Sequence, residues 1–499
     1  MWGVMMATLF DQPFTARPLR PHQTKAMTLI RQSLLAGNKR VVCQLPTGAG
    51  KTRLAAEIVN GALSKGRTVA FTVPALSLID QTVEAFASEG IDCVGVMQGD
   101  HELRNMAMPV QVCSVQTLDR RGCPDVDLVI VDECHLQHKI LRDWMGKRPN
   151  VPFIGLSATP WAKGMAENWQ DLVCPVGMQE LIDQGFLAPF QVYAPTHPDL
   201  SQVRTKAGEY HEADLSEVMG ERRLVADIVG TWLKLAEWRP TLVFAVDRAH
   251  AAKLQEEFRQ AGVPMGYCDA FTDRIERAVL FAQMASGQIA GIVNVGTLTT
   301  GVDADVRCIV LANPTKSEMR HVQIVGRALR TAPGKSHALI LDHADNHSRL
   351  GFVTDIHHEK LLSGKEKALT KREKGEPLPK ECPSCNTLKQ PKVRVCPVCQ
   401  FEPTRQSEIE TEDGELIEVT KAMAKTKPTM AEKAAFYGQL LWIARERGRS
   451  HGWASHSYRA KFGVWPIGEA KSARPVPATP EVLAFVRAKD IRFAKRKEK

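Results

Sequence analysis

Short apolar runs alternate with longer amphipathic segments through the first 350 residues of this 499-residue chain. We predict strands at residues 41–45, 69–73, 110–114, 127–131 and 153–157. The alternation resumes with predicted strands at 241–245, 291–295, 308–312 and 338–341. Alternating strands and helices are typical of a parallel α/β sheet. We therefore expect two tandem α/β domains that meet near residues 186–192.

The pattern changes after about residue 352, where charged, cysteine-containing and aromatic segments replace the alternation. A chain of this length exceeds what one hydrophobic core holds, so several domains are expected. We predict a first domain at 1–188, a second at 189–352, a charged linker at 353–381, a cysteine module at 382–403, an acidic linker at 404–429 and a basic, mainly helical region at 430–499.

Positive charge is concentrated at the C-terminal end. Residues 361–499 carry 28 Lys and Arg against 17 Asp and Glu, whereas the chain as a whole has a net charge of +9. The first 360 residues are therefore close to neutral. A basic end suits a polyanionic partner, although a solvated basic tail is the plain alternative.

No stretch approaches the roughly 18 consecutive apolar residues of a membrane span. The apolar N-terminus lacks the basic start of a secretory signal. Eight of the 12 cysteines are scattered singly, which is typical of a reducing compartment. We expect a cytoplasmic protein with no membrane partner.

Residues 46–52 have the composition of a phosphate-binding loop between a strand and a helix. Gly48 and Gly50 let backbone N–H groups turn toward phosphate, Lys51 offers a positive charge, and the Thr52 hydroxyl can ligate Mg²⁺. Leu45 stands where the strict pattern has a glycine. A simple glycine-rich turn is the alternative. The predicted nucleotide-binding residues of the loop are Pro46, Thr47, Gly48, Ala49, Gly50, Lys51 and Thr52.

Two adjacent carboxylates, Asp132 and Glu133, follow a four-residue apolar strand about eighty positions later. Asp132 at the strand end is placed to bind the metal, and Glu133 to polarise the attacking water. Arg327 and Arg330 lie three residues apart, hence on one face of a helix. They can stabilise the transition state from across a cleft, although a solvated basic helix is the alternative. The predicted catalytic residues are Lys51, Asp132, Glu133, Arg327 and Arg330.

The cysteine module contains two Cys-x2-Cys pairs separated by ten residues. Four thiolates at this spacing suit a closed, structural Zn²⁺ site, with disulfides as the alternative. Lys389, Lys392 and Arg394 between the pairs can contact phosphate or act as a structural spacer. The predicted zinc ligands are Cys382, Cys385, Cys396 and Cys399.

Six aromatic side chains lie among arginines within residues 436–462. Aromatic side chains beside cations can stack on unpaired bases while the cations neutralise phosphates. A small helical core that buries the aromatics and exposes the arginines is the alternative.

In their order and separation, these motifs resemble those of the superfamily-two helicases over residues 17–345. The likeness is nearest to the DEAD/DEAH-box-like DNA helicases of bacteria and phages, of the DNA-repair and branch-migration group. Asp132-Glu133-Cys134-His135 matches the DECH variant of motif II. The resemblance implies two RecA-like domains with ATP between them and nucleic acid across their top. The zinc-ribbon-like module and the helical C-terminal region lie beyond it.

The resemblance also implies roles for further residues. Gln23 would read adenine, and Gly301 and Asp303 would complete the nucleotide site. His135, Ser157, Ala158, Thr159 and Gln323 would couple hydrolysis to strand movement. We expect sugar-phosphate contacts without base specificity from Ser114, Thr117 and Thr297.

We therefore predict an ATP-dependent DNA helicase or translocase of the bacterial or phage-infected cytoplasm that requires Mg²⁺ and Zn²⁺. Its expected partner is single-stranded, forked or branched DNA, and a monomer is favoured. An RNA helicase is the nearest alternative. A translocating subunit that moves along duplex without unwinding it is another.

Overall fold

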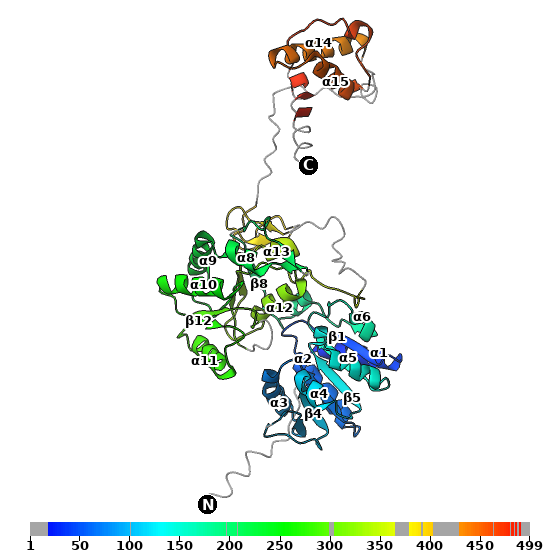
Figure 1. Ribbon diagram of the computed structural model, residues 1–499, viewed down its shortest axis with the longest axis vertical. Helices are drawn as coiled ribbons and strands as arrows, with labels where there is room; N and C mark the ends of the chain where they lie inside the picture. Colours follow the sequence, from blue (N-terminus) through cyan, green and yellow to red (C-terminus); the bar gives the residue numbers. More distant parts are fainter. Residues whose placement is uncertain are drawn as a thin grey trace, which may run out of the picture. The chain divides into compact units, whose positions relative to one another are not determined.

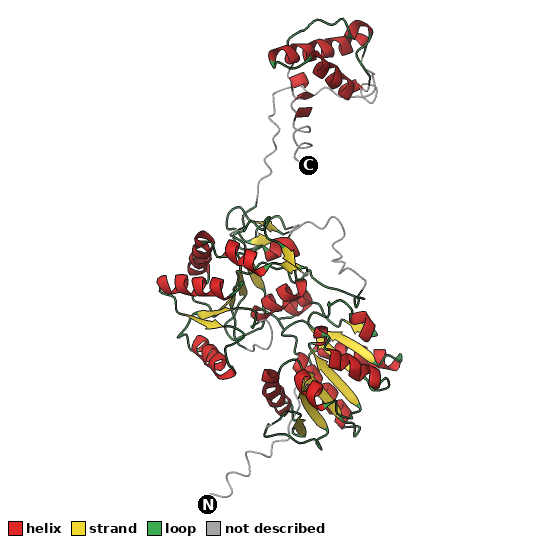
Figure 2. Ribbon diagram, viewed as in Figure 1, coloured by secondary structure: helices red, strands yellow, loops and turns green. Residues whose placement is uncertain are grey.

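A computed structural model describes residues 18–490 apart from 100, 196, 207, 299–303, 365–378, 391–392, 403–428, 463, 480, 484 and 487–488. The chain divides into two compact units, Met1–Thr404 and Arg405–Lys499. The first unit contains two parallel sheets, each covered by helices, as Figures 1 and 2 show. The predicted pair of α/β domains is thereby confirmed.

The first sheet has seven parallel strands in the order β3-β4-β2-β5-β6-β1-β7. With its helices we call it the first lobe. Its strands are β1 (Arg40–Gln44), β2 (Val69–Val73), β3 (Val94–Val96), β4 (Val110–Ser114), β5 (Leu128–Asp132), β6 (Phe153–Ser157) and β7 (Asp171–Val173). Its helices are α1 (Pro21–Leu35), α2 (Lys51–Leu63), α3 (Ile79–Ala87), α4 (Val115–Arg121), α5 (Lys139–Lys147), α6 (Met165–Asn168) and α7 (Met178–Asp183).

Side chains of each strand alternate between the two faces of this sheet. Val41 and Cys43 of β1 join the core beneath α1, α2 and α3, whereas Val42 joins the core beneath α4 and α5. Both faces are buried, which is why the strands are nearly continuous apolar runs. The carboxyl ends of β1 and β5 consequently lie at one edge, two strands apart, where the phosphate loop and Asp132 follow them.

The second sheet has six parallel strands in the order β12-β13-β11-β14-β15-β8. With its helices we call it the second lobe. Its strands are β8 (Phe190–Tyr193), β11 (Thr241–Phe244), β12 (Met265–Cys268), β13 (Gly291–Asn294), β14 (Cys308–Leu311) and β15 (Ala338–Asp342). Its helices are α8 (Glu212–Met219), α9 (Arg222–Leu235), α10 (Arg248–Gln260), α11 (Arg274–Ala285), α12 (Glu318–Ala328) and α13 (Asn346–Leu350), beside a hairpin of β9 (Thr205–Lys206) and β10 (Glu209–Tyr210).

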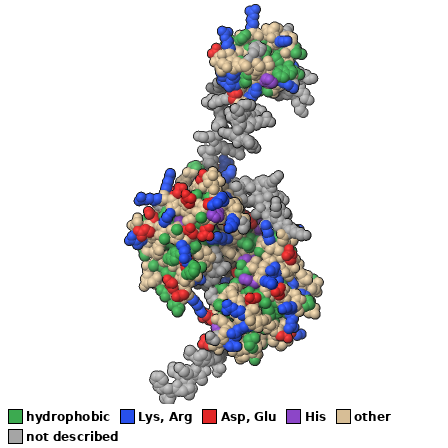
Figure 3. Space-filling model, viewed as in Figure 1, with side chains coloured by type: hydrophobic (Ala, Val, Ile, Leu, Met, Phe, Trp, Pro, Cys, Tyr) green, Lys and Arg blue, Asp and Glu red, His purple; other side chains and the backbone are tan. Residues whose placement is uncertain are grey.

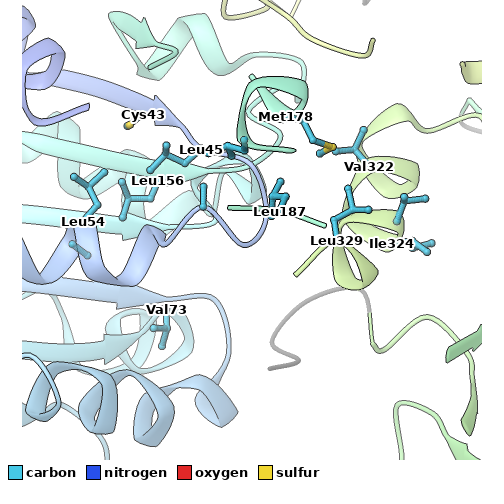
Figure 4. Packing of buried hydrophobic residues seen from close by; sticks show 14 of the residues in the cluster. Cys43, Leu45, Leu54, Val73, Leu156, Met178, Leu187, Val322, Ile324 and Leu329 are labelled. Atoms are coloured by element: carbon cyan, nitrogen blue, oxygen red, sulfur yellow. The ribbon is translucent and has the colours of Figure 1, made fainter. Parts of the chain in front are cut away.

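One apolar cluster runs from the first lobe into the second. Met178 of α7 and Leu187 just beyond it share this cluster with Val322 and Leu329, which belong to α12 and its C-terminal cap. Figure 4 shows these four side chains where the lobes meet. The packing fixes α12 beside the phosphate loop. This helix, which carries Arg327 and is called the arginine helix below, therefore faces the first lobe.

The segment after α13 returns to the first lobe. The backbone N–H of Ala166 in α6 donates to the carbonyl oxygen of Leu362 at 3.1 Å. His358 Nε2 lies 3.0 Å from Glu318 Oε2 at the start of α12. Residues 351–364 therefore act as a strap between the lobes, in addition to the connection before β8. Figure 3 shows Lys and Arg side chains interspersed with Asp and Glu on the visible face of both lobes.

The second unit is built on the helices α14 (Met430–Glu446) and α15 (His451–Phe462). Tyr437 and Tyr458 are 1% and 2% exposed in its core. The Tyr437 hydroxyl is within 2.7 Å of Ser455 Oγ. Of the two alternatives for the aromatic stretch, the structure favours the helical core for these tyrosines. Among the described residues, no helix is both long and apolar enough to cross a membrane.

Candidate active site

The phosphate loop turns from β1 into α2 through two residues with left-handed backbone. Gly48 and Gly50 both have φ of 85°. A Cβ on Gly50 would lie 2.5 Å from Gln23 Nε2, and one on Gly48 would lie 2.8 Å from a Leu187 methyl carbon. Both positions therefore require glycine for conformation and for space. Lys51 begins α2, which points the helix N-terminus at the cavity.

Gln23 contacts the loop directly. Its Nε2 donates to the carbonyl oxygen of Gly50 at 3.0 Å, and its Oε1 accepts the backbone N–H of Arg20 at 2.9 Å. Sequence reasoning assigned no role to Arg20, three residues before Gln23, and did not identify Phe186; both line the same cavity. The Arg20 guanidinium lies 5.0 Å from the Phe186 ring centroid. No local pattern marks Phe186, because only the fold brings it to this wall.

The two carboxylates stand at the end of β5. Glu133 has an unusual φ of 47°, and its Oε1 is 3.7 Å from Lys51 Nζ. Loss of solvation, with repulsion from Glu133, raises the pKa of Asp132 to about 7. A half-buried carboxylate pair of this kind fits a divalent cation, which would remove the electrostatic cost. Thr52 and Asp132 are the residues that would hold Mg²⁺.

The helix α12, which carries Arg327, closes the cavity from the other lobe. It ends at Ala328, so Arg330, which was expected on the same helix face, lies just beyond the helix in an antiparallel bridge with Leu187. Arg327 is 6% exposed on α12, and Gly326 packs so closely that an added Cβ would lie 3.0 Å from Thr47 Cβ. The Arg330 Cγ approaches Gly48 in the same way. The cavity measures about 700 Å³. Its walls include Thr47, Gly48, Gly50, Lys51, Thr52, Asp132, Glu133, Arg327 and Arg330.

A hydrogen-bond network joins the lobes beside this cavity. Gln323 Nε2 donates to Thr159 Oγ1 at 3.0 Å and lies 3.3 Å from His135 Nε2. His135 Nδ1 is 2.9 Å from Ser157 Oγ, which also accepts the backbone N–H of Thr159 at 3.0 Å. Burial lowers the pKa of His135, so the ring is neutral and its Nε2 can accept. The structure thus brings together four of the five predicted coupling residues; Ala158 is buried beside them.

Two of the three hydroxyl groups predicted to contact nucleic acid already have partners within the protein. Ser114 is fully buried and caps α4 by accepting the backbone N–H of Thr117 at 3.1 Å. Their hydroxyls are 3.0 Å apart, so each is already engaged. Thr297 is half-buried, 3.6 Å from Cys268 Sγ. Gly301 and Asp303 lie outside the described residues.

The four cysteines of the module converge, with all Sγ atoms within 4.8 Å of one another. Cys382 and Cys399 Sγ are 3.6 Å apart, as are Cys385 and Cys396 Sγ. Tetrahedral zinc with bonds of about 2.3 Å needs sulfurs about 3.8 Å apart, so the residues fit a structural zinc. None of the twelve cysteines, all of which lie among the described residues, forms a disulfide.

The two halves of the module repeat one backbone pattern. The N–H of Cys382 donates to Thr387 O and that of Cys396 to Phe401 O, each at 2.9 Å. Asn386 has φ of 58°, and the equivalent residue of the second half has φ of 59°. Each loop therefore presents its cysteines in the same geometry.

The module packs against the edge of the second sheet. Its hairpin, β16 (Lys380–Glu381) and β17 (Leu388–Lys389), lies beside β8, and Thr387 forms an antiparallel bridge with Tyr193. Lys389 is 7% exposed and donates from Nζ to the carbonyl oxygen of Arg394 at 2.8 Å. Of the two alternatives for the basic residues, the structural one holds for Lys389. Lys392 lies outside the described residues.

Two family models match the chain in order. Residues 17–162 match the res subunit of type III restriction enzymes, and residues 223–332 match the helicase conserved C-terminal domain. The chain is 27% identical over 372 residues to the 51.5 kDa protein of a Lactococcus phage, covering 71% of this chain and 76% of that protein. It is 28% identical over 358 residues to IRC3 of Saccharomyces cerevisiae, provisionally named an ATP-dependent helicase, covering 66% and 52%.

Among solved structures, a fragment provisionally assigned as the HsdR subunit of a Vibrio vulnificus type I restriction enzyme shares the fold. Its TM-score is 0.54 at 23% identity, covering 68% of this chain and 66% of the fragment. The chain therefore spans about half to three quarters of the length of these three proteins. Taken with the two lobes and the cavity between them, these matches show that the chain belongs to the superfamily-two helicases, the ATP-dependent motors that move along or unwind nucleic acids.

Proposed function

We propose that the protein is a DNA-stimulated ATPase whose two lobes close and open to move along or unwind DNA. One observation carries the proposal: side chains from both lobes line a single cavity of about 700 Å³. Four cationic side chains, Arg20, Lys51, Arg327 and Arg330, line the same cavity as Asp132 and Glu133. That combination matches the charges of a metal-bound nucleoside triphosphate.

Each residue has a defined task in the proposal. Lys51 binds the β- and γ-phosphates, and Thr52 and Asp132 would hold Mg²⁺, which would offset phosphate charge when bound. Glu133 accepts the proton of the attacking water and orients it. Its Oε1 lies 3.7 Å from Lys51 Nζ, and its Oε2 lies 3.4 Å from His135 Nδ1. Arg327 and Arg330 stabilise the negative charge that develops on the transferred phosphoryl group.

Movement follows from the location of the arginines on the opposite lobe. Because they reach the terminal phosphate only when the lobes are together, hydrolysis and phosphate release favour separation. The bonds of Gln323 to Thr159 and His135 are made in the same closed arrangement. Each hydrolysis cycle thereby opens and closes the two lobes once. If DNA is bound across both lobes, this movement shifts the protein along the DNA.

A second candidate is a motor that moves along duplex DNA without separating its strands. The match of the first lobe to the res subunit of type III restriction enzymes favours this candidate. It differs from a helicase only in the outcome of movement, so both share the same ATP site.

ATPase rates with single-stranded, duplex, forked and four-way DNA and with matching RNA test the proposal. Strand displacement from forks supports a helicase, and triplex displacement without strand separation supports a duplex motor. Stimulation by RNA alone would contradict both. Lys51→Ala should abolish turnover, and Glu133→Gln should abolish turnover while ATP binding persists. Normal hydrolysis by Glu133→Gln would contradict the role of Glu133.

A further inference from the structure

Lys335 lies outside the cavity, in the loop between the arginine helix and β15. Its Nζ donates to three backbone carbonyl oxygens: Val306 at 2.7 Å, Ala328 at 2.6 Å and Arg330 at 2.7 Å. An ammonium group has three N–H donors, so every one of them is used. Hydrogen bonds from a charged donor are stronger than those between neutral groups.

Two of the acceptors lie at the C-terminal end of α12: Ala328 is its last residue, and Arg330 lies two residues beyond it. The last carbonyl groups of an α-helix have no partner within the helix. Lys335 satisfies Ala328, and the backbone N–H of Ala188 donates to the next carbonyl, Leu329, at 2.7 Å. The carbonyl oxygen of Arg330 accepts a second hydrogen bond from Lys335. A cation at this end also suits the helix dipole.

The loop is shaped to present Lys335. The backbone N–H of Lys335 donates to the carbonyl oxygen of Ala332 at 3.1 Å, which closes a turn with Pro333 and Gly334 at its centre. Gly334 has φ of 69°, as the third position of a type II turn requires. Arg307 braces the turn by donating to Pro333 O at 2.8 Å.

We propose that Lys335 is a positioning residue for ATP hydrolysis, which fixes the backbone of Arg330 so that its guanidinium faces the phosphate loop. The backbone of Arg330 is held from two sides, by Lys335 and by its antiparallel bridge with Leu187. The third acceptor, Val306, belongs to the segment that precedes β14, so Lys335 also ties the arginine helix to the sheet of its own lobe. The inference rests on the proposed role of Arg330.

Lys335→Met tests this proposal, because methionine has no donor but a similar unbranched side chain. We expect its DNA-stimulated kcat to fall about 10- to 100-fold while KM for ATP changes less than threefold. Lys234→Met on α9 replaces an exposed lysine and should keep wild-type rates. Thermal melting and binding of a fluorescent ATP analogue check that the variants are folded and bind nucleotide.

A double-mutant cycle with Arg330→Ala separates positioning from general damage. If Lys335 acts through Arg330, adding Lys335→Met to Arg330→Ala should change kcat less than twofold. A further tenfold loss in the double variant would overturn the inference, as would a Lys335→Met variant with wild-type kcat. Unchanged kcat in Arg330→Ala alone would instead contradict the proposed function. If Lys335→Met does not fold, Lys335→Arg carries the same cycle, since it keeps charge but changes the donor geometry.

Discussion

Replacing Gln323 by methionine tests the contact between the lobes. The substitution keeps an unbranched side chain of similar length but removes the amide that donates to Thr159 at 3.0 Å and contacts His135 at 3.3 Å. Thr159 and His135 are 0% and 7% exposed, so water cannot readily replace the lost partner. Both groups would remain partly unsatisfied in the closed arrangement.

The magnitude follows from those two bonds. A neutral hydrogen bond contributes about 0.5–1.5 kcal/mol net, and a buried group left without its partner costs somewhat more. Loss of two such bonds should make the free energy of lobe closure less favourable by about 1–3 kcal/mol. Because 1.4 kcal/mol corresponds to a factor of ten, closure should become roughly 5- to 150-fold less favourable. The pocket residues of each lobe are untouched, so ATP affinity of the open form should be little changed.

DNA-stimulated ATPase activity measures the effect. We expect kcat/KM for Gln323→Met to fall about 5- to 150-fold. Gln288→Met, an exposed glutamine beyond α11, is a matched control that should keep wild-type values. Fluorophores on the two lobes should report a smaller closed fraction with a non-hydrolysable ATP analogue and DNA.

Thr159→Val completes a double-mutant cycle with Gln323→Met. A coupling energy of about 1 kcal/mol is expected if the bond operates in the reacting state. Additivity within about 0.3 kcal/mol would refute the reasoning, because it would mean that the Gln323–Thr159 bond does not contribute to closure.

Three further predictions concern the loop, the cysteine module and the second lobe. Gly50→Ala should reduce ATP affinity at least tenfold, measured by nucleotide titration, because φ of 85° and the nearby Gln23 amide exclude a Cβ; unchanged affinity would contradict this. Purified protein should contain one zinc per chain by elemental analysis, and chelation should lower the first melting transition because the module packs on β8; an unaltered transition would show that the metal is dispensable. Loss of solvation lowers the pKa of His250 to about 4. The free energy of unfolding should therefore decrease by on the order of 3 kcal/mol as the pH falls from 6.5 toward 4, because the unfolded chain binds a proton there that the folded protein does not. Urea melts from pH 7 to 4.5 measure this loss, and His250→Gln should weaken the pH dependence.

The strands and the phosphate loop could be predicted from local sequence. Predicted strand bounds at 69–73, 110–114 and 153–157 agree with the structure, because a continuous apolar run is required wherever a strand is buried on both faces. The short edge strands β3, β7, β8 and β12 were not predicted, since three or four residues carry little periodicity. Gly50 and Lys51 were identified because phosphate binding restricts residue types at adjacent positions.

Contacts between distant segments could not be predicted in the same way. The pairing of Gln323 with Thr159 and the capping of Arg330 by Lys335 depend on how two sheets pack, and neither produces a local pattern. Phe186 was missed for the same reason. Lys389 could equally have bound phosphate, and only its burial shows that it braces the cysteine module instead.

The sequence by itself determined which chemical groups are present and which strand or loop carries each of them. Adjacent residues share a backbone geometry, so loops, caps and buried strands are encoded over a few positions. The tertiary structure decided which groups meet, since packing of α12 against the phosphate loop brings residues nearly 280 positions apart to one cavity. It also decided that Tyr437 and Tyr458 form a core, because burial is a property of the whole unit.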